Sequence, residues 1–339
     1  MTRKGAEATS RRWRRSIPAV RTAGGDVWDA GVLDGDVAMH DGVSCASCGV
    51  PATSVRAQTA RPGRRAVAAY FRIKHKGGEH AFGCEYDFDR QVKLILEDAG
   101  PDLMTAQSGL YRLRLPLMAE PERQDDSWAG GGGGDPHTVE WRVLSAAARI
   151  QQLLNGYQRH PEAAELFVAE YRGREISWGD FCWDLTLPAR VEELMTELTR
   201  PEWESDWHPM AVWSWNNGSV TASPGGGCRL TLTRVYGRGA VARLRGDDVG
   251  VFARVDPRHR CVMGYGRLDL LRTGTRSRSP ELSLAVGHAS AVTSWDLRVW
   301  PPRAWIHASA SSLAASGYAA SGAATSKPTA RQSSAGRVS

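Results

Sequence analysis

The chain has 339 residues, of which 43 are Lys or Arg and 37 are Asp or Glu, which gives a formal net charge of +6. No apolar run reaches the roughly 20 residues that a membrane-spanning helix needs, so we expect a cytoplasmic protein with no membrane partner. Six cysteines in so long a chain do not make a disulfide framework, and the moderate positive charge permits DNA or RNA as a partner.

The first third of the chain divides into an arm and a small module. Residues 1–42 are rich in Arg, Gly, Asp and Ala without a sustained hydrophobic period, so we expect a disordered basic arm. Residues 43–119 form the module. Within it, residues 67–73 and 111–117 alternate as strands do. A helix is expected to begin at Cys84, with apolar residues at helical spacing over 88–99 until a Gly-Pro pair stops it.

A glycine-rich linker and a helical segment follow. Residues 120–137 contain five consecutive glycines with polar flanks, which cannot bury a core, so a domain boundary is expected there. Residues 138–204 are predicted to be helical. One apolar stripe ends at an Asn-Gly pair at 155–156, and Pro161 and Pro188 are each suited to open a further helix.

Residues 205–306 change to short alternating segments, which predict a C-terminal all-β barrel or sandwich, with an OB-like barrel as one candidate. The expected strands cover residues 212–215, 230–232, 249–255, 282–286 and 295–299. The Asn-Asn-Gly sequence at 216–218 predicts a hairpin turn. Residues 307–339 are Ala, Ser, Gly and Thr with almost no large apolar group and predict a disordered tail. The fold class expected is α+β.

The most specific motif is a set of metal-ligand residues in the module. Cys45 and Cys48 form a Cys-x-x-Cys knuckle, and about 30 residues later His80 and Cys84 are separated by three residues. Two such pairs can complete a tetrahedral Cys3His site for Zn2+. His75 lies close enough in sequence to replace His80 as the fourth ligand.

The predicted zinc site is structural and belongs to a small zinc-knuckle module of treble-clef or ribbon-like form. All four ligand positions are filled by protein, so the site is closed and does not activate water. A redox role for the knuckle is disfavoured, because Gly49, Val50 and Pro51 follow it where a redox motif is followed by a helix.

The knuckle, a strand ending in Tyr70-Phe71-Arg72 and the His80–Cys84 pair together resemble the N-terminal zinc module of bacterial competence CoiA-like proteins and related hypothetical proteins. The likeness covers residues 43–95. It implies a bound metal and a DNA-related setting. Members of that family carry a nuclease-like domain after the module, and its acidic-lysine signature is not found in this sequence.

Aromatic and basic residues supply candidates for a nucleic-acid interface. Thirteen tryptophans are present, and in an OB-like barrel such rings can stack on bases beside arginines such as Arg243 and Arg245. The competing interpretation is that tryptophans fill the core. The candidate nucleic-acid-binding residues are Arg72, Lys74, Arg229, Arg234, Arg238, Trp213 and Trp215.

The function predicted from these features is that of a zinc-stabilised, non-catalytic protein associated with DNA or RNA. One alternative is a protein-interaction scaffold whose zinc only holds the fold, with a protein as its partner. Another is a CoiA-like nuclease or other hydrolase, although no phosphate-binding loop, G-x-S-x-G elbow or HExxH motif occurs, so no catalytic residue is assigned.

Overall fold

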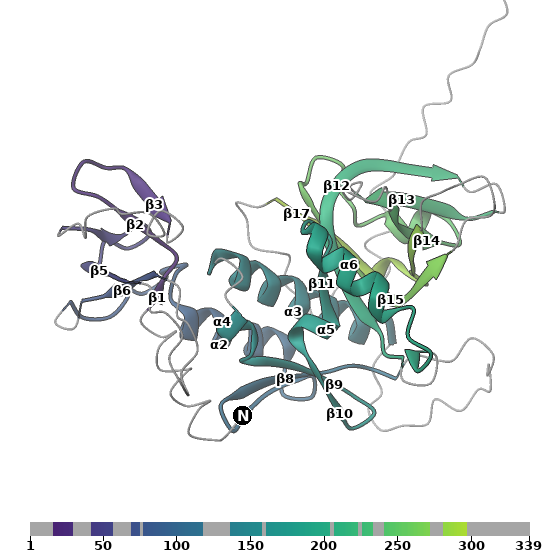
Figure 1. Ribbon diagram of the computed structural model, residues 1–339, viewed down its shortest axis with the longest axis horizontal. Coiled ribbons are helices and arrows are strands. Elements are labelled where there is room, and N and C mark those ends of the chain that lie inside the picture. Colours follow the sequence, from purple (N-terminus) through teal and green to yellow (C-terminus); the bar gives the residue numbers. More distant parts are fainter. Residues whose placement is uncertain are drawn as a thin grey trace, which may run out of the picture. The chain divides into compact units, whose positions relative to one another are not determined.

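A computed structural model describes residues 16–29, 42–56, 69–74, 77–117, 136–157, 161–203, 207–222, 226–232, 241–271 and 281–296 (Figure 1). Met1–Ala304 form one compact unit. Most of the predicted linker and the whole predicted tail lie outside the described residues. Helices and extensive sheets both occur, so the predicted α+β class is confirmed. Within the described ranges, no helix is long and apolar enough to span a membrane.

Short antiparallel strands surround the Cys-x-x-Cys segment. These strands are β1 (Ser16–Ile17), β2 (Ala19–Arg21), β3 (Val27–Asp29), β4 (Ser44–Cys45), β5 (Ala52–Val55) and β6 (Tyr70–Ile73). In the described part of the chain they form two three-stranded sheets, ordered β1-β6-β5 and β3-β2-β4. Ile17 and Val20 are buried between them, so the expectation of disorder over 1–42 is wrong for residues 16–29. Strands of two or three residues are too short to produce a detectable hydrophobic period.

Helix α2 (Phe88–Ala99) ends where the Gly-Pro pair predicts, but it begins four residues after Cys84, the expected start. Asp87 caps its start by accepting a hydrogen bond from the Arg90 backbone N–H, and Gly100 ends it with a φ of 81°, where a side chain would be strained. A hairpin of β7 (Met104–Gln107) and β8 (Leu110–Arg114) follows the helix.

The predicted boundary at residues 120–137 does not separate two domains. The next elements are α3 (Pro136–Gly156), α4 (Pro161–Ala164), β9 (Phe167–Tyr171) and β10 (Arg174–Ser177). β9 pairs in parallel with β8, so one sheet, ordered β10-β9-β8-β7, includes strands from both sides of the linker. Arg149 of α3 is buried in an ion pair with Asp98 of α2. The predicted module and helical segment therefore share one core.

The segment predicted as helical also contains strands. After β10 come α5 (Trp178–Phe181), β11 (Cys182–Asp184) and α6 (Pro188–Glu197). Residues 167–171 alternate between buried and half-buried positions, which is the period of a strand, and this alternation outweighs their expected helical state. The helix predicted to open at Pro188 is present, with Val191 and Leu194 buried.

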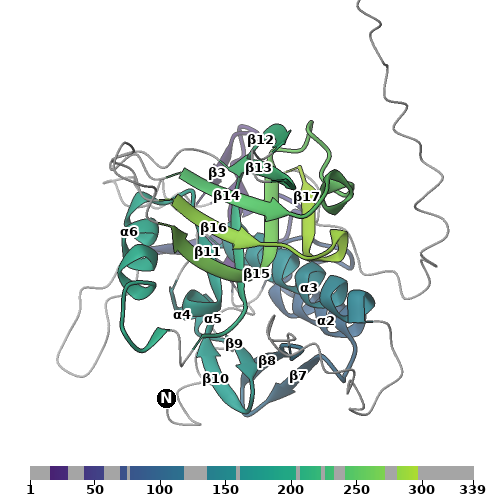
Figure 2. The same ribbon diagram turned by 90° about the vertical axis from the view of Figure 1, so that its right-hand side faces the viewer.

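Five strands of the C-terminal part close into a barrel (Figure 2). The strands of this region are β12 (Met210–Ala222), β13 (Cys228–Leu232), β14 (Val241–Gly246), β15 (Cys261–Leu271), β16 (Glu281–Ala285) and β17 (Val292–Trp295). The ring runs β12-β13-β14-β16-β15 and returns to β12, with β14 and β16 parallel and the other pairs antiparallel. A closed five-stranded barrel is the OB-like alternative of the prediction, and β11 and β17 extend the sheet.

Two expectations about the barrel are wrong. The Asn-Asn-Gly sequence does not end a strand, because β12 continues through it with an irregularity in pairing between Asn216 and Val220. The Asn216 amide donates to the carbonyls of Asp256 and His259, which satisfies the backbone at that bend. Residues 249–252 form the 3-10 helix η2 (Val249–Phe252), capped by Asp248, instead of a strand.

The strands β12 and β15 each have two buried faces. Met210 and Val212 face the barrel interior, whereas Ala211 and Trp213, on alternate positions, belong to the core that contains α3. Helix α3 therefore covers this side of the barrel, and the outer face of β13, β14 and β16 is left uncovered by it.

Candidate metal centre

The Cys-x-x-Cys knuckle is a tight turn that leaves β4. The backbone N–H of Cys45 donates to the Val50 carbonyl at 2.8 Å, and that of Gly49 donates to the Cys45 carbonyl at 2.9 Å. Gly49 has a φ of 76°, a conformation that costs glycine little and other residues more. This turn brings the sulfur of Cys48 back beside that of Cys45.

The second pair of ligand residues lies in the loop that leads into α2. The Cys84 backbone N–H donates to the Ala81 carbonyl at 3.0 Å, and the Gln91 amide donates to the Cys84 carbonyl at 3.3 Å. The helix itself begins at Phe88, so Cys84 precedes the first turn by several residues instead of forming part of it.

The structure brings the four predicted ligands together. One ligand atom from each of Cys45, Cys48, His80 and Cys84 lies within 4.8 Å of all the others. The Cys45 and Cys84 sulfurs are 3.8 Å apart, and His80 Nδ1 lies 3.4 Å from the Cys48 sulfur and 3.3 Å from the Cys84 sulfur. These short separations bring three sulfurs and one imidazole nitrogen to a common point. The four residues can hold a metal ion, and the alternative ligand, His75, lies outside the described residues.

No protein-family model, curated protein or solved structure matches this chain. The resemblance to the CoiA-like zinc module therefore stays a prediction.

Burial and hydrogen bonding together set the proton affinity of each residue in the cluster. Burial raises the pKa of the Cys45 thiol to about 12 and also raises that of Cys84. Burial acts on Cys48 as well, but hydrogen bonds from backbone N–H groups outweigh it and hold the pKa of Cys48 below its ordinary value. Burial lowers the pKa of His80, which keeps the imidazole in the neutral form that binds metals. Without a cation, the two buried thiols would hold their protons at neutral pH.

The candidate nucleic-acid residues do not gather at one place. Arg72 is exposed on β6 and Lys74 is half-buried just after it, both in the strand region of the metal module. Arg229 lies on β13 of the barrel, whereas Arg234 and Arg238 lie outside the described residues.

The two candidate tryptophans lie on the covered side of the barrel. Trp213 is 0% exposed, so neither face of its ring is accessible to a base, and stacking by this residue is excluded in this fold. Trp215 is half-buried and packs edge-on against Trp213, with ring centroids 5.4 Å apart. For this pair, the interpretation that the tryptophans fill the core is therefore correct.

Sequence reasoning did not identify Tyr157, which ties the metal-site loop to α3. Its fully buried hydroxyl donates to the carbonyl of Tyr86, two residues after the ligand Cys84, at 2.9 Å. The residue follows the Asn-Gly pair that was predicted to end the helix, so it carried no functional signal in the sequence.

We expect Tyr157→Phe to destabilise the protein by about 1–2 kcal/mol, because it leaves a buried carbonyl without its donor. Tyr265→Phe is the matched control, since the Tyr265 hydroxyl is buried without a hydrogen-bond partner among the described residues. Its removal should change the free energy of unfolding little or increase it. Urea denaturation of both variants measures the difference, and equal effects would contradict the assigned role of Tyr157.

Proposed function

We propose that the chain is a zinc-stabilised protein that binds nucleic acid through the outer face of its barrel. Thiolate-rich tetrahedral sites favour zinc over hard cations such as calcium or magnesium. Zinc–sulfur bonds of about 2.3 Å and zinc–nitrogen bonds of about 2.0 Å give tetrahedral edges of about 3.8 Å between sulfurs and about 3.5 Å between sulfur and nitrogen. The observed distances of 3.8, 3.4 and 3.3 Å fit those edges.

The proposed zinc has a structural role. Cys45, Cys48, His80 and Cys84 supply four ligands, which leaves no open position for a water molecule or a substrate. The apolar core around them is small and includes two of the ligands themselves. An ion that binds only the folded state adds its binding free energy to the stability of such a module.

The observation that carries the nucleic-acid proposal is a row of arginines on the uncovered face of the barrel. Along β13 and β14, residues such as Leu230 and Leu244 are buried in the interior. Arg229, Arg243 and Arg245 take the alternate positions, which point outward. This alternation places three guanidinium groups on one surface.

Two of these arginines lie directly opposite each other on neighbouring strands. Arg229 and Arg245 are direct register partners on antiparallel strands, and like charges in that position are destabilising. Arg243 is paired with Glu281, and Arg245 donates through Nε to Ser283 Oγ, so both side chains are held against β16. A polyanion that lies along β13 and β14 would contact both guanidinium groups.

Fluorescence anisotropy with labelled single-stranded DNA and RNA, titrated at several salt concentrations, tests this proposal. We expect Arg245→Ala to weaken binding and to reduce the slope of log K against log salt by about 0.7 for one lost phosphate contact. Arg200→Ala, which removes an exposed arginine at the end of α6, is the control and should leave the slope unchanged. Wild-type protein with no salt-dependent affinity for either nucleic acid would refute the proposal.

A further inference from the structure

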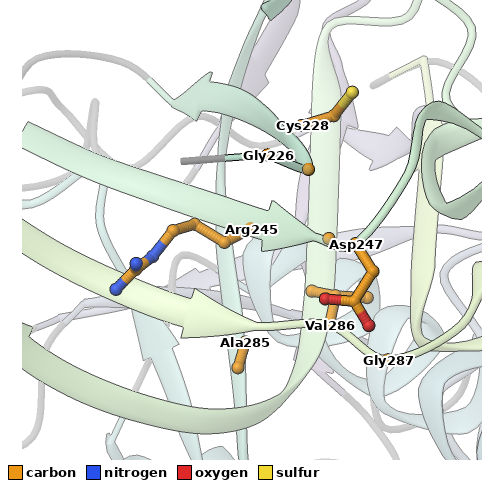
Figure 3. A pocket seen from close by; sticks show the side chains of 9 residues that line it. Gly226, Cys228, Arg245, Asp247, Ala285, Val286 and Gly287 are labelled. Atoms are coloured by element: carbon orange, nitrogen blue, oxygen red, sulfur yellow. The ribbon is translucent and has the colours of Figure 1, made fainter. Parts of the chain in front are cut away.

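A pocket of about 660 Å³ opens at the end of the barrel where β13 begins and where β14 and β16 end (Figure 3). The lining residues are Gly226, Gly227, Cys228, Arg245, Gly246, Asp247, Ala285, Val286 and Gly287. The volume falls within the range of about 300–1,000 Å³ that is usual for ligand pockets. Arg245 belongs both to this pocket and to the row of arginines on the outer face, so the two surfaces are continuous.

The pocket is open because many of the residues that line it are glycines, which have no side chains to fill it. Four of its nine lining residues are glycines. A Cβ on Gly226 or Gly287 would meet nothing within 4 Å, so both positions face open space. A Cβ on Gly227 would lie 2.6 Å from the Gly246 carbonyl oxygen, so glycine is needed there for β13 and β14 to approach. Bare backbone walls of this kind allow a flat ring to approach closely.

The polar groups of the pocket are few and of opposite charge. Asp247 is exposed at one side, and its carboxylate has no hydrogen bond or ion pair with any described residue. Arg245 is exposed beside it, with its Nε held by Ser283. Figure 3 shows the Arg245 guanidinium extending along the barrel, away from the Asp247 carboxylate, so these two charges do not neutralise each other. The pocket therefore offers an acceptor-only carboxylate, and the Arg245 guanidinium, which extends from the pocket along the barrel, can hold a phosphate.

We propose that this pocket holds one guanine base of a single-stranded nucleic acid, with Asp247 accepting hydrogen bonds from its Watson–Crick edge; the inference rests on the proposed function. Guanine presents an imino N–H and an amino N–H side by side, which match the two oxygens of a carboxylate. Cytosine and adenine offer an amino group beside an acceptor, and thymine and uracil place carbonyls on both sides of one N–H, which a carboxylate repels. Recognition of an unstacked base on this edge is the usual route to sequence preference in single strands.

The test compares two oligonucleotides that differ at one base. One contains guanine and the other contains hypoxanthine, which lacks the amino group, and each is made as DNA and as RNA. For the wild-type protein, we expect the loss of that amino group to weaken binding on the order of tenfold, the size of a typical base contact. Asp247→Asn should bind the two oligonucleotides equally. Because this variant also loses a negative charge, its affinity for oligothymidine should stay equal or rise.

Two further variants separate base recognition from charge and folding. Asp26→Asn removes the same charge from an exposed turn between β2 and β3 and should keep the preference for guanine. Gly287→Leu fills the pocket at a position with open space and no left-handed backbone, so it should fold and lose the preference. Thermal unfolding of each variant confirms folding.

The outcomes distinguish this inference from the proposed function. Salt-dependent binding by the wild-type protein with no difference between guanine and hypoxanthine would overturn the guanine pocket and leave the arginine face standing. An equal guanine preference in Asp247→Asn would overturn the role of Asp247. Absence of all salt-dependent binding would overturn both. A preference in the DNA pair, the RNA pair or both identifies the natural strand.

Discussion

Replacement of Cys84 by serine is expected to abolish metal binding and to unfold the N-terminal strands. Cys84 is buried, its sulfur lies 3.8 Å from the Cys45 sulfur and 3.3 Å from His80 Nδ1, and it has no spare ligand nearby among the described residues. Structural zinc contributes on the order of 10 kcal/mol to the folding of small modules, and the core around this site is small. This is the largest effect that we expect from a single substitution in the chain.

Unfolding caused by metal loss should remain local. The small core of the metal module, which contains Ile17, Val20 and Phe71, is separate from the core of α2 and α3 and from the interior of the barrel. Units with separate cores can open without global unfolding. Limited proteolysis should therefore cut the N-terminal strands of Cys84→Ser first, while the barrel resists.

Elemental analysis of purified full-length protein measures the bound metal. We expect about one zinc ion per wild-type chain. Cys228→Ser, which removes a thiol outside the cluster, should keep that ion. Acidification should release the metal, because protons compete for the thiolates and for the imidazole of His80. Wild-type protein that contains no metal and keeps its N-terminal strands in the presence of a chelator would contradict the proposal.

The sequence predicted features that depend on local chemistry. Helix α2 was located from its apolar spacing and from the Gly-Pro pair, and its end at Ala99 is correct, whereas it begins at Phe88 instead of at Cys84. The four metal ligands were identified from the spacing of two pairs, because ligand spacing is set by the geometry of the ion. The apolar spacing of the helix and the spacing within each ligand pair both involve residues that lie close together in the sequence.

Features that depend on contacts between distant residues were not predicted. The parallel pairing of β8 with β9 crosses the glycine-rich linker, so composition suggested a boundary where the sheet continues. The Asn-Asn-Gly sequence has the residues of a hairpin turn, but the Asn216 side chain donates to the carbonyls of Asp256 and His259, and β12 continues past an irregularity in pairing. The position of the Asp247 carboxylate beside a glycine-lined pocket could not be predicted, since nothing in the sequence shows that β14 and β16 end together.

Trp213→Ala is expected to lower the free energy of unfolding by about 3–5 kcal/mol, the usual cost of removing a large buried aromatic side chain. Trp213 is fully buried, and its ring packs against Trp295 with centroids 6.4 Å apart, between the barrel strand β12 and the core of α3. No described element fills the space that alanine would leave, so we expect a cavity at this junction. Urea denaturation measures the loss.

The same variant decides between the two interpretations of the tryptophans. If Trp213 belongs only to the core, the folded fraction of Trp213→Ala binds single-stranded DNA and RNA with wild-type affinity and salt dependence. Arg245→Ala should show the reverse, with weaker binding and near wild-type stability, because its side chain is exposed on the opposite, uncovered face. Weaker binding by Trp213→Ala without a loss of stability would instead support base stacking by Trp213. It would place the nucleic-acid interface on the side of the barrel that α3 covers. The separation of effects follows from the two places that the side chains occupy, since Trp213 of β12 packs in the core that contains α3, whereas Arg245 of β14 is exposed on the outer face of the barrel.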